Sequence, residues 1–261
     1  LTGGVGMLFK KNKVEHVIGA ASIKSPTEVV AGERLLTTRN IVIATGSAPI
    51  QVGGLPFDGK HILSSTEALT LDAVPQRLLI VGGGYIGVEL GSVWSRLGSN
   101  VTIVEFTDRV LPASDAETAL ALQKSLTKQG ITFRFNTSAE SAKVEAGAIR
   151  VKIKSGETLE ELAVDKVIVA VGRRPVTDGL GLPALGVTTS KRGFIEVNDH
   201  YQTSVPGIHA IGDVIGKIML AHNAEEEGVA LAEILAGKPG HVNYKACLPW
   251  CTRIPSSARW A

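Results

Sequence analysis

Three glycines in the middle of the chain have the spacing of a phosphate-binding loop. Gly82, Gly84 and Gly87 form a G-x-G-x-x-G motif directly after the apolar residues 78–81, which predict a short buried strand. The first glycine permits a tight turn, the second lets the backbone approach a pyrophosphate, and the third lets a helix pack closely on the strand. Free N–H groups and the dipole at the start of that helix attract an anion. A glycine-rich turn without a ligand would contain the same residues, so the motif needs support from its surroundings.

An acidic residue follows the glycines at the distance that a ribose requires. Apolar residues at helical spacing predict a helix that ends at Gly98, and residues 101–105 predict a second strand that ends on Glu105. A carboxylate at this place accepts hydrogen bonds from both hydroxyls of an adenosine ribose. It would repel the 2′-phosphate of NADP by roughly 3 kcal/mol per unit charge at about 5 Å and an effective dielectric of about 20. Because strand, helix, second strand and acid are all present, we predict a site for NAD.

Other predicted elements also end in residues that could contact a ligand. The apolar residues 41–44 run into a Thr-Gly-Ser sequence at 45–47, where bare backbone could touch a flat or phosphorylated molecule. Residues 203–213 predict a short strand that ends on Asp213, whose carboxylate could fix a sugar or ribityl hydroxyl. The helix predicted over residues 220–235 begins with a positive dipole end, which suits an electron-rich ring.

A buried strand predicted over residues 166–171 ends at Gly172. Ligands of a doubly wound sheet bind beyond the carboxyl ends of its strands, so Gly172 is expected to line a nicotinamide site. Arg173 and Arg174 fit surface cations equally well. His222 has the chemistry of a general base, but a histidine in a first helical turn more often packs or caps the helix. We therefore assign no catalytic residue.

The composition argues against several other classes of function. The 261 residues are 44% hydrophobic, enough for one large core or two smaller ones. Lys and Arg number 27 against 25 Asp and Glu, without a basic run, so charge gives no reason to expect a nucleic acid or a membrane surface as partner. No apolar run reaches the length of a membrane span. The histidines lack metal-ligand spacing, so we expect no metal site.

Periodicity and turn residues predict the remaining secondary structure. Residues 1–24 predict a lysine-rich link followed by a strand at 14–20, and residues 29–38 predict one exposed strand. Ser114 and Glu117 fit a capping box for a helix over 115–129. A further strand and an antiparallel meander are predicted over residues 131–135, 149–154 and 159–164.

Taken together, the motifs resemble the dihydrolipoamide dehydrogenases of the pyridine nucleotide-disulfide oxidoreductase family. The segments that carry the resemblance, in the family's order, are residues 44–47 (ATGS), 82–89 (GGGYIGVE), 105 (Glu), 172–175 (GRRP), 211–214 (IGDV) and 219–222 (MLAH). GYIGVELGSVW with Glu105 is more similar to this NAD-linked group than to NADP-linked glutathione reductases. The resemblance implies a flavoprotein oxidoreductase with FAD and NAD as cofactors, which passes electrons from dihydrolipoamide through a cysteine pair and the flavin to NAD.

The resemblance also implies roles for individual residues. The FAD site would use a glycine near the adenine, a Thr-Gly-Ser sequence, an acid at the ribityl chain and the start of the last helix. These residues are Gly19, Thr45, Gly46, Ser47, Asp213, Met219, Leu220, Ala221 and His222. The NAD site would use the glycine loop, the acid, two backbone contacts and a tyrosine beside the nicotinamide. These residues are Gly82, Gly83, Gly84, Tyr85, Ile86, Gly87, Val88, Glu89, Glu105, Ala139 and Gly172.

We therefore expect an α/β fold with two interleaved Rossmann-like FAD/NAD(P)-binding units, parallel sheets and an antiparallel meander. Residues 1–47 and 179–240 would form parts of the FAD-binding domain, and residues 48–178 the NAD-binding domain. Residues 241–261 would begin the family's dimerisation domain. Their last part, after Leu248, is also consistent with a frame shift.

Several family features do not occur in this sequence. The first FAD-binding glycine loop, the C-x4-C redox pair and the C-terminal His-Glu pair are not found, so the chain is expected to be an incomplete and inactive piece of the enzyme. Cys247 and Cys251 have C-x3-C spacing at the other end and are not expected to replace the pair. The lysine usual after the Met-Leu-Ala-His sequence is Asn223 here, so local polar contacts are expected to differ.

The resemblance further implies partners and a location. The partner would be a lipoamide-bearing protein of a 2-oxo acid dehydrogenase complex or of the glycine cleavage system, and the full-length protein would be a homodimer. The location would be the mitochondrial matrix if the source is eukaryotic and the cytoplasm if it is bacterial. Two alternatives stay open, an inactive fragment that binds NAD and FAD, and another NADH-dependent flavoprotein disulfide reductase.

Overall fold

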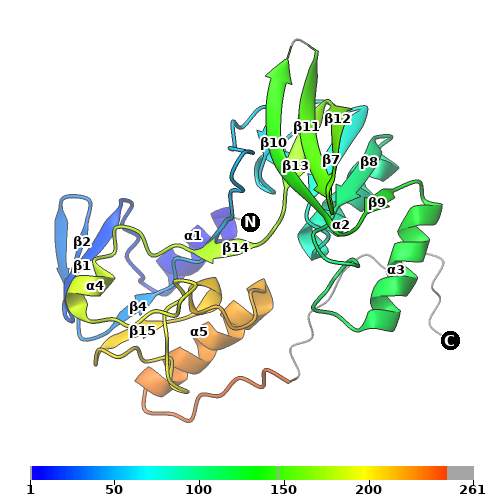
Figure 1. The fold of residues 1–261 in the computed structure, drawn as a ribbon. Helices are drawn as coiled ribbons and strands as arrows, with labels where there is room; N and C mark the ends of the chain where they lie inside the picture. Colours follow the sequence, from blue (N-terminus) through cyan, green and yellow to red (C-terminus); the bar gives the residue numbers. More distant parts are fainter. Residues whose placement is uncertain (1, 146, 246–261) are drawn as a thin grey trace. The chain divides into compact units, whose positions relative to one another are not determined.

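The computed structural model describes residues 2–145 and 147–245. They form two compact units, which we call the split unit (residues up to 47 and from 174) and the central unit (residues 48–173) (Figure 1). The chain passes between them in β5 (Ser47–Pro49) and β14 (Arg173–Pro175), which pair with each other. The predicted fold class of two interleaved α/β units is confirmed. The assignment of the units to FAD and NAD stays a prediction.

A parallel sheet of five strands forms the middle of the central unit, in the order β6-β13-β7-β8-β9. The strands are β6 (Ile62–Leu63), β7 (Arg77–Val81), β8 (Asn100–Val104), β9 (Thr132–Arg134) and β13 (Lys166–Val169). Helix α2 (Tyr85–Arg96) connects β7 with β8, and α3 (Ala116–Lys128) connects β8 with β9. A short 3-10 helix, η1 (Glu67–Leu69), precedes β7. The predicted strand, helix and strand around the glycines are therefore confirmed.

Alternate residues of β7 pack on opposite sides of the sheet, as the two-residue repeat of a strand requires. Leu78 and Ile80 belong to the hydrophobic cluster that includes residues of α2 and α3. Leu79 and Val81 belong to the cluster that includes residues of the antiparallel meander. All four are at most 6% exposed. Burial on both faces explains why the sequence of this strand is an uninterrupted apolar run.

The antiparallel meander consists of β10 (Thr137–Glu145), β11 (Ala148–Ser155) and β12 (Thr158–Val164). Its middle strand alternates, with Ile149, Val151 and Ile153 buried and the intervening residues exposed. The meander was predicted from the sequence, but β10 was not. The polar sequence of β10, TSAESAKVE, lacks the apolar alternation from which strands are recognised.

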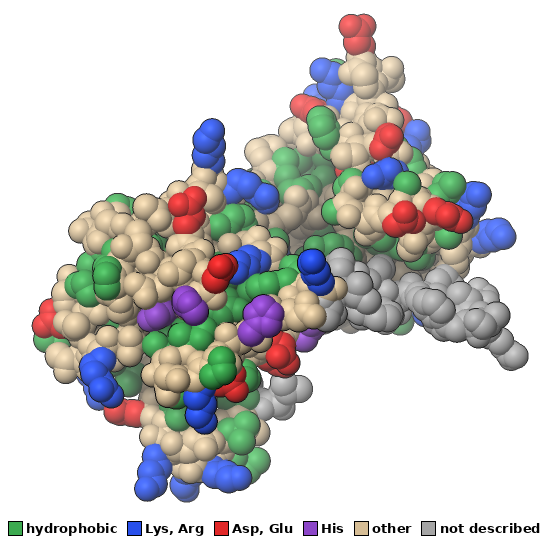
Figure 2. Space-filling model, turned by 90° about the horizontal axis from the view of Figure 1, so that it is seen from below, with side chains coloured by type: hydrophobic (Ala, Val, Ile, Leu, Met, Phe, Trp, Pro, Cys, Tyr) green, Lys and Arg blue, Asp and Glu red, His purple; other side chains and the backbone are tan. Residues whose placement is uncertain are grey.

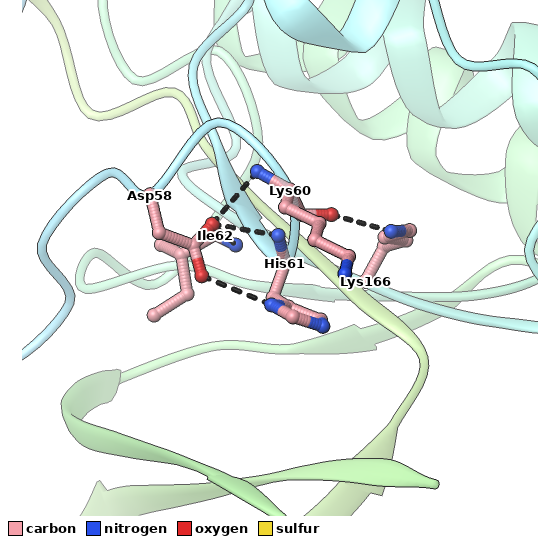
Figure 3. A network of polar contacts seen from close by, with 5 residues as sticks. All are labelled: Asp58, Lys60, His61, Ile62 and Lys166. Atoms are coloured by element: carbon pink, nitrogen blue, oxygen red, sulfur yellow. Dashed lines mark hydrogen bonds and ion pairs between the residues drawn. The ribbon is translucent and has the colours of Figure 1, made fainter.

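One carboxylate holds the loop before β6 (Figure 3). Asp58 Oδ1 accepts hydrogen bonds from the backbone N–H groups of Lys60, His61 and Ile62 at 2.8, 2.6 and 2.9 Å, and Oδ2 lies 3.1 Å from His61 Nδ1. Lys166, at the start of β13, donates to the Lys60 carbonyl. Burial disfavours the charged form of Asp58, but the backbone hydrogen bonds outweigh it and lower the pKa of Asp58 from 3.8 to about 2.

We expect the central unit to lose this stabilisation in strong acid. Because the pKa of Asp58 is lower in the folded chain, its contribution is present above 3.8 and is lost as the pH falls towards 2. The side chain is 37% exposed, so water weakens the effect and it should stay below about 1 kcal/mol. Thermal unfolding between about pH 5 and about pH 2 should therefore show a weaker pH dependence for Asp58→Ala than for the wild type. An equal pH dependence in both proteins would contradict this assignment.

The split unit contains a small antiparallel sheet and a parallel strand pair. The antiparallel strands are β1 (Ala21–Ser25), β2 (Glu28–Ala31) and β3 (Arg34–Thr37), and the parallel strands are β4 (Ile41–Ile43) and β15 (Ile208–Ala210). The helices are α1 (Thr2–Lys11), α4 (Leu182–Leu185), the 3-10 helix η2 (Gly212–Ile215) and α5 (Ala221–Leu235). A hydrophobic cluster joins β4, β15 and α5, with Ile43, Ile208 and Leu231 each at most 3% exposed.

Apolar side chains also reach the surface of the split unit. In β4, Ile41 and Ile43 are buried, whereas Val42 between them is 41% exposed. Met7 on α1 and Val229 on α5 are 72% and 58% exposed. In the view of Figure 2, hydrophobic side chains lie between charged side chains of both signs.

Four local predictions were wrong. Residues 2–11 form α1 instead of a link, and residues 14–20 form no strand, since most of their side chains are exposed and offer no buried face. The segment 29–38 is not one strand, because Gly32 adopts φ +61° in a turn between β2 and β3. The N-cap of α3 is Asp115 rather than Ser114, since Asp115 Oδ1 accepts a hydrogen bond from the Thr118 N–H.

Candidate functional site

The carboxyl ends of β7, β8 and β13 lie at one edge of the parallel sheet, because these neighbours run in the same direction. Gly82 follows β7 directly, Glu105 follows β8, and Gly172 lies shortly beyond β13. Backbone hydrogen bonds continue past the strand ends, from the Gly82 N–H to the Val104 carbonyl at 2.9 Å and from the Ala170 N–H to the Val81 carbonyl at 2.7 Å. The structure therefore brings three of the predicted NAD-site residues to the same edge of one sheet.

Two glycines of the loop are required by close packing. Gly82 has φ +112°, and a Cβ atom on it would lie 2.4 Å from the carbonyl oxygen of Ala170. A Cβ atom on Gly87 would lie 2.0 Å from the carbonyl oxygen of Gly82. No side chain fits at such distances, so the turn into α2 needs glycine at both places.

Gly84 has a different environment. It is the N-cap of α2, and a Cβ atom on it would meet nothing within 4 Å. As a glycine, this N-cap residue supplies no side-chain cap to the first N–H groups of α2. There is also free space beside Gly84. A pyrophosphate needs both features, so the loop fits the group that the motif predicts.

Glu105 holds the loop from the neighbouring strand. It is 9% exposed, and its Oε2 accepts a hydrogen bond from the Gly83 N–H at 2.6 Å. Its Oε1 accepts from the N–H and the hydroxyl of Thr107, both at 2.8 Å. A carboxylate has about four acceptor positions, so three are used within the chain and a ribose hydroxyl can take the remaining one. The sequence predicts Glu105 as a ribose ligand alone and gives no sign of its hydrogen bonds with Thr107.

The other residues of the glycine motif divide between core and surface. Val88 is 2% exposed and Ile86 packs against the same cluster, so both fix α2 on the sheet. Tyr85, in the first turn of α2, is 42% exposed and accessible to a ligand. Glu89 is half-buried one turn further along.

The two predicted backbone contacts lie at different places of the central unit. Ala139 is 7% exposed on β10, where it pairs with Ile153 of β11. Gly172 has φ +133°, and its carbonyl accepts a hydrogen bond from the Ile50 N–H at 3.0 Å. Only Gly172 follows a strand of the parallel sheet.

In the split unit, the carboxyl ends of β4 and β15 are adjacent because the two strands are parallel. Ser47, after β4, donates a hydrogen bond from Oγ to Asp213 Oδ2, after β15, at 2.5 Å. Gly46 has φ +71° and its carbonyl accepts from the Val176 N–H at 3.0 Å, while Thr45 donates its hydroxyl to the Val176 carbonyl at 2.5 Å. Segments far apart in the sequence thus meet here, as the prediction of a common ligand requires.

The last four of the residues predicted for the FAD site lie at the start of α5. Met219 and Leu220 are half-buried, and Ala221 and His222 are exposed. The N-cap residue of α5 is Leu220, which offers no side-chain cap, and the positive dipole end of the helix suits an electron-rich group. The next residue, Asn223, is 0% exposed, and its amide nitrogen and oxygen have no partner among the described residues. An unpaired buried amide is unusual and fits a place where a ligand group completes the hydrogen bonding.

Gly19 lies immediately before β1, apart from these residues in the sequence. A Cβ atom on Gly19 would lie 3.0 Å from the backbone nitrogen of Gly32. The structure therefore gives this glycine a packing role at the end of the small antiparallel sheet. Its predicted place beside an adenine stays a prediction.

Two other kinds of site are absent from residues 2–145 and 147–245. In that part of the chain, no three His, Cys, Asp or Glu side chains come together as a metal site would require. In the same part, no helix has the length and apolar character to cross a membrane. Cys247, Cys251 and the segment predicted to be frame-shifted lie outside the described residues.

Comparison with known proteins identifies the family. Residues 1–228 match the family described as "Pyridine nucleotide-disulphide oxidoreductase". The chain belongs to this pyridine nucleotide-disulphide oxidoreductase family. Proteins of the family and its dihydrolipoyl dehydrogenases use FAD and NAD, so the resemblance seen in the sequence is confirmed at this level.

Curated and solved members of the pyridine nucleotide-disulphide oxidoreductases resemble the chain throughout. A mitochondrial dihydrolipoyl dehydrogenase of Dictyostelium discoideum is 48% identical over 255 residues, covering 94% of this chain and 52% of that protein. Dihydrolipoyl dehydrogenase 3 of Pseudomonas putida is 45% identical over 251 residues, covering 94% and 54%. The HOCl-induced flavoprotein disulfide reductase RclA from Escherichia coli superposes with a TM-score of 0.80 at 27% identity, covering 91% and 56%. The chain thus spans about half the length of the curated relatives it matches.

Proposed function

We propose that this chain is the nucleotide-binding part of a dihydrolipoyl dehydrogenase, with NAD at the carboxyl edge of the central unit and FAD in the split unit. The observation that carries the proposal is the glycine loop whose Gly83 N–H is held by the buried Glu105 carboxylate at 2.6 Å. An acid in this position favours a ribose with free hydroxyls over one with a 2′-phosphate. The identity of 45–48% with relatives named dihydrolipoyl dehydrogenase supports the same reaction.

In this proposal the residues of the chain bind and orient. The N–H groups of Gly84 and Tyr85 at the start of α2 would bind the pyrophosphate of NAD, and Glu105 would accept a ribose hydroxyl. Asp213 would accept hydroxyls of the ribityl chain, and the start of α5 would face the flavin ring. Bound FAD would supply the redox chemistry, namely electron transfer between a dithiol and a nicotinamide.

The proposed reaction can be tested with two proteins. The first is this 261-residue chain, and the second is a longer chain in which it is joined to the remaining parts of the Pseudomonas putida relative. We expect the first to bind NADH but not to oxidise it with lipoamide, and the second to show lipoamide-dependent NADH oxidation. A longer chain that binds both cofactors but has no activity with lipoamide would contradict the proposed substrate. Turnover by the short chain would contradict our view that the thiol relay lies elsewhere.

A second candidate is an NADH-dependent flavoprotein disulfide reductase with another substrate. The likeness to RclA, with a TM-score of 0.80, supports it, since the name of that protein includes flavoprotein disulfide reductase. The longer chain would then reduce another disulfide faster than lipoamide. A third hypothesis is a fragment that binds nucleotides without catalysing a reaction. Both proteins would then bind NADH, and neither would oxidise it.

We also propose the partners and the location that the relatives suggest. The partner would be a lipoamide-bearing protein of a 2-oxo acid dehydrogenase complex or of the glycine cleavage system, and the full-length protein would form a homodimer. Relatives with mitochondrial and bacterial origins are both found. The location would accordingly be the mitochondrial matrix in a eukaryote and the cytoplasm in a bacterium.

Replacement of Asp213 tests the flavin part of the proposal. Asp213→Ala should weaken FAD binding by about tenfold or more, because hydrogen bonds to a charged group contribute about 1.5–3 kcal/mol. Ser47→Ala, which removes only the hydroxyl that orients Asp213 Oδ2, should have a smaller effect. The measurement is quenching of flavin fluorescence on titration with protein. Equal affinity in Asp213→Ala and the wild type would remove Asp213 from the site.

A further inference from the structure

A buried carboxylate lies behind the turn that carries Asp213. Glu227 of α5 is 1% exposed, and its Oε2 accepts a hydrogen bond from the Gly212 N–H at 2.6 Å. Gly212 begins η2 with φ +73° and directly precedes Asp213. Since a buried anion needs donors on its oxygens, the position of Gly212 and that of Glu227 depend on each other.

The second oxygen of the same carboxylate has a different donor. Tyr244 donates its hydroxyl to Glu227 Oε1 at 2.7 Å and lies 3.1 Å from the hydroxyl of Tyr201. Burial, together with these two hydrogen bonds, raises the pKa of Tyr244, so its hydroxyl stays protonated and continues to donate. Lys217 Nζ lies 4.7 Å from the centre of the Tyr244 ring, where its charge offsets part of the buried negative charge.

Tyr244 belongs to a segment that packs on α5 at alternate residues. A Cβ atom on Gly240 would lie 2.0 Å from the carbonyl oxygen of Ala230, so the backbone passes directly over the helix. Val242 is 5% exposed within the hydrophobic cluster of the split unit. Tyr244 is the next contact in this series and the one that reaches Glu227. We call residues 240–244 the docking segment.

We propose that Glu227 and Tyr244 are positioning residues that link docking of this segment to the conformation of the Gly212–Asp213 turn, and through it to flavin affinity. Undocking of Tyr244 would leave the buried carboxylate with one donor instead of two. Glu227 would then move towards water and release the Gly212 N–H, so the turn would no longer hold Asp213 in place. Linkage is reciprocal, so a ligand that fixes the turn would also hold the segment on α5. The flavin part of this inference rests on the proposed function.

Amide hydrogen exchange at Gly212 tests the link without any cofactor. In the 261-residue chain, Tyr244→Phe should accelerate exchange at Gly212 by about tenfold or more, because a donor to a buried charge is lost. The comparison variant is Tyr201→Phe, which removes the hydroxyl 3.1 Å from that of Tyr244 and leaves the Tyr244 donor to Glu227 in place. The Ile23 N–H, bonded to the Leu180 carbonyl at 3.0 Å, reports on general stability of the split unit. Exchange should rise at Gly212 but not at Ile23.

Flavin binding is measured on the same proteins by fluorescence titration. FAD affinity should fall about tenfold in Tyr244→Phe and should be largely kept in Glu227→Gln, whose amide can accept from Gly212 and donate to Tyr244. Unchanged exchange at Gly212, equal effects in Tyr201→Phe and Tyr244→Phe, or unchanged FAD affinity in Tyr244→Phe would each overturn the inference. If the wild-type chain binds no FAD while Gly212 still responds to Tyr244→Phe, the proposed flavin site fails and the link between segment and turn stands.

Discussion

Gly87→Ala is expected to lower the NADH affinity of the central unit by about a hundredfold. The new Cβ atom would lie 2.0 Å from the Gly82 carbonyl oxygen and 3.2 Å from Ile80 Cγ2, both of which are buried in the turn and the sheet. The start of α2 must therefore move away from β7, and its N–H groups would no longer converge on a pyrophosphate. Overpacking of this kind costs about 1–3 kcal/mol in stability. NADH affinity should fall by about a hundredfold even in the folded fraction, because the whole anion site is displaced.

A pair of matched variants separates damage to the fold from damage to the site. Gly84→Ala adds a methyl group where the chain leaves free space, so it should keep its melting temperature and still bind NADH more weakly, since the proposed pyrophosphate occupies that space. Gly53→Ala, also without a neighbour within 4 Å, should change neither property. NADH affinity at the wild-type level in Gly84→Ala would show that no phosphate lies beside this residue.

Glu105→Arg is expected to lower NADH affinity by about a hundredfold and to reduce the preference over NADPH. The carboxylate provides the acceptor for the Gly83 N–H and for the N–H and hydroxyl of Thr107. Arginine would remove these acceptors together with the one left for a ribose hydroxyl. Its positive charge would attract a 2′-phosphate in the place where the carboxylate repels it.

Two milder variants separate the effect of the Glu105 charge on NADH binding from the effect of its position. Glu105→Gln keeps an acceptor for Gly83 and removes the charge, so it should relax discrimination against NADPH with a smaller loss of NADH affinity. Thr107→Ala removes one donor to Glu105 and should weaken NADH binding only a few-fold, through the position of the carboxylate. Binding is measured by NADH and NADPH fluorescence. If Glu105→Arg retains the wild-type ratio of the two affinities, Glu105 does not contact the ribose.

The β7–α2–β8 unit could be predicted because its constraints are local. The run from Leu78 to Val81 is apolar at every position, which is the pattern of a strand buried on both faces. The glycines at 82 and 87 mark backbone contacts too close for a side chain. The spacing to Glu105 follows from the length of one helix and one strand. Each of these features is visible in a short window of sequence.

Other elements gave no such signal. Helix α1 contains Gly3, Gly4 and Gly6, which have low helix propensity, and the lysines that follow them predict a link instead. Asp115 and Ser114 are both good caps, and only the hydrogen bond to Thr118 decides between them. Local propensity was an insufficient guide in both cases.

The contacts that complete the candidate sites depend on tertiary structure. The pairing of Ser47 with Asp213 joins residues 166 positions apart, and no short motif shows it. In the sequence Glu227 is an ordinary helical acid, and no motif connects it with Tyr244. Only the fold joins Tyr244 to Glu227 and Glu227 to Gly212. Asn223 stands where the family usually has lysine, but its complete burial follows only from the packing of α5.

The most direct test of the central claim is a titration of the isotope-labelled chain with NADH, followed by amide chemical shifts. We expect saturable shifts at Gly83, Gly84 and Tyr85 and at Glu105, with NADPH binding at least about tenfold more weakly. This result would place the pyrophosphate on the start of α2 and the ribose at Glu105. An absence of shifts in the folded chain, or shifts confined to residues outside the carboxyl edge of the parallel sheet, would contradict the account.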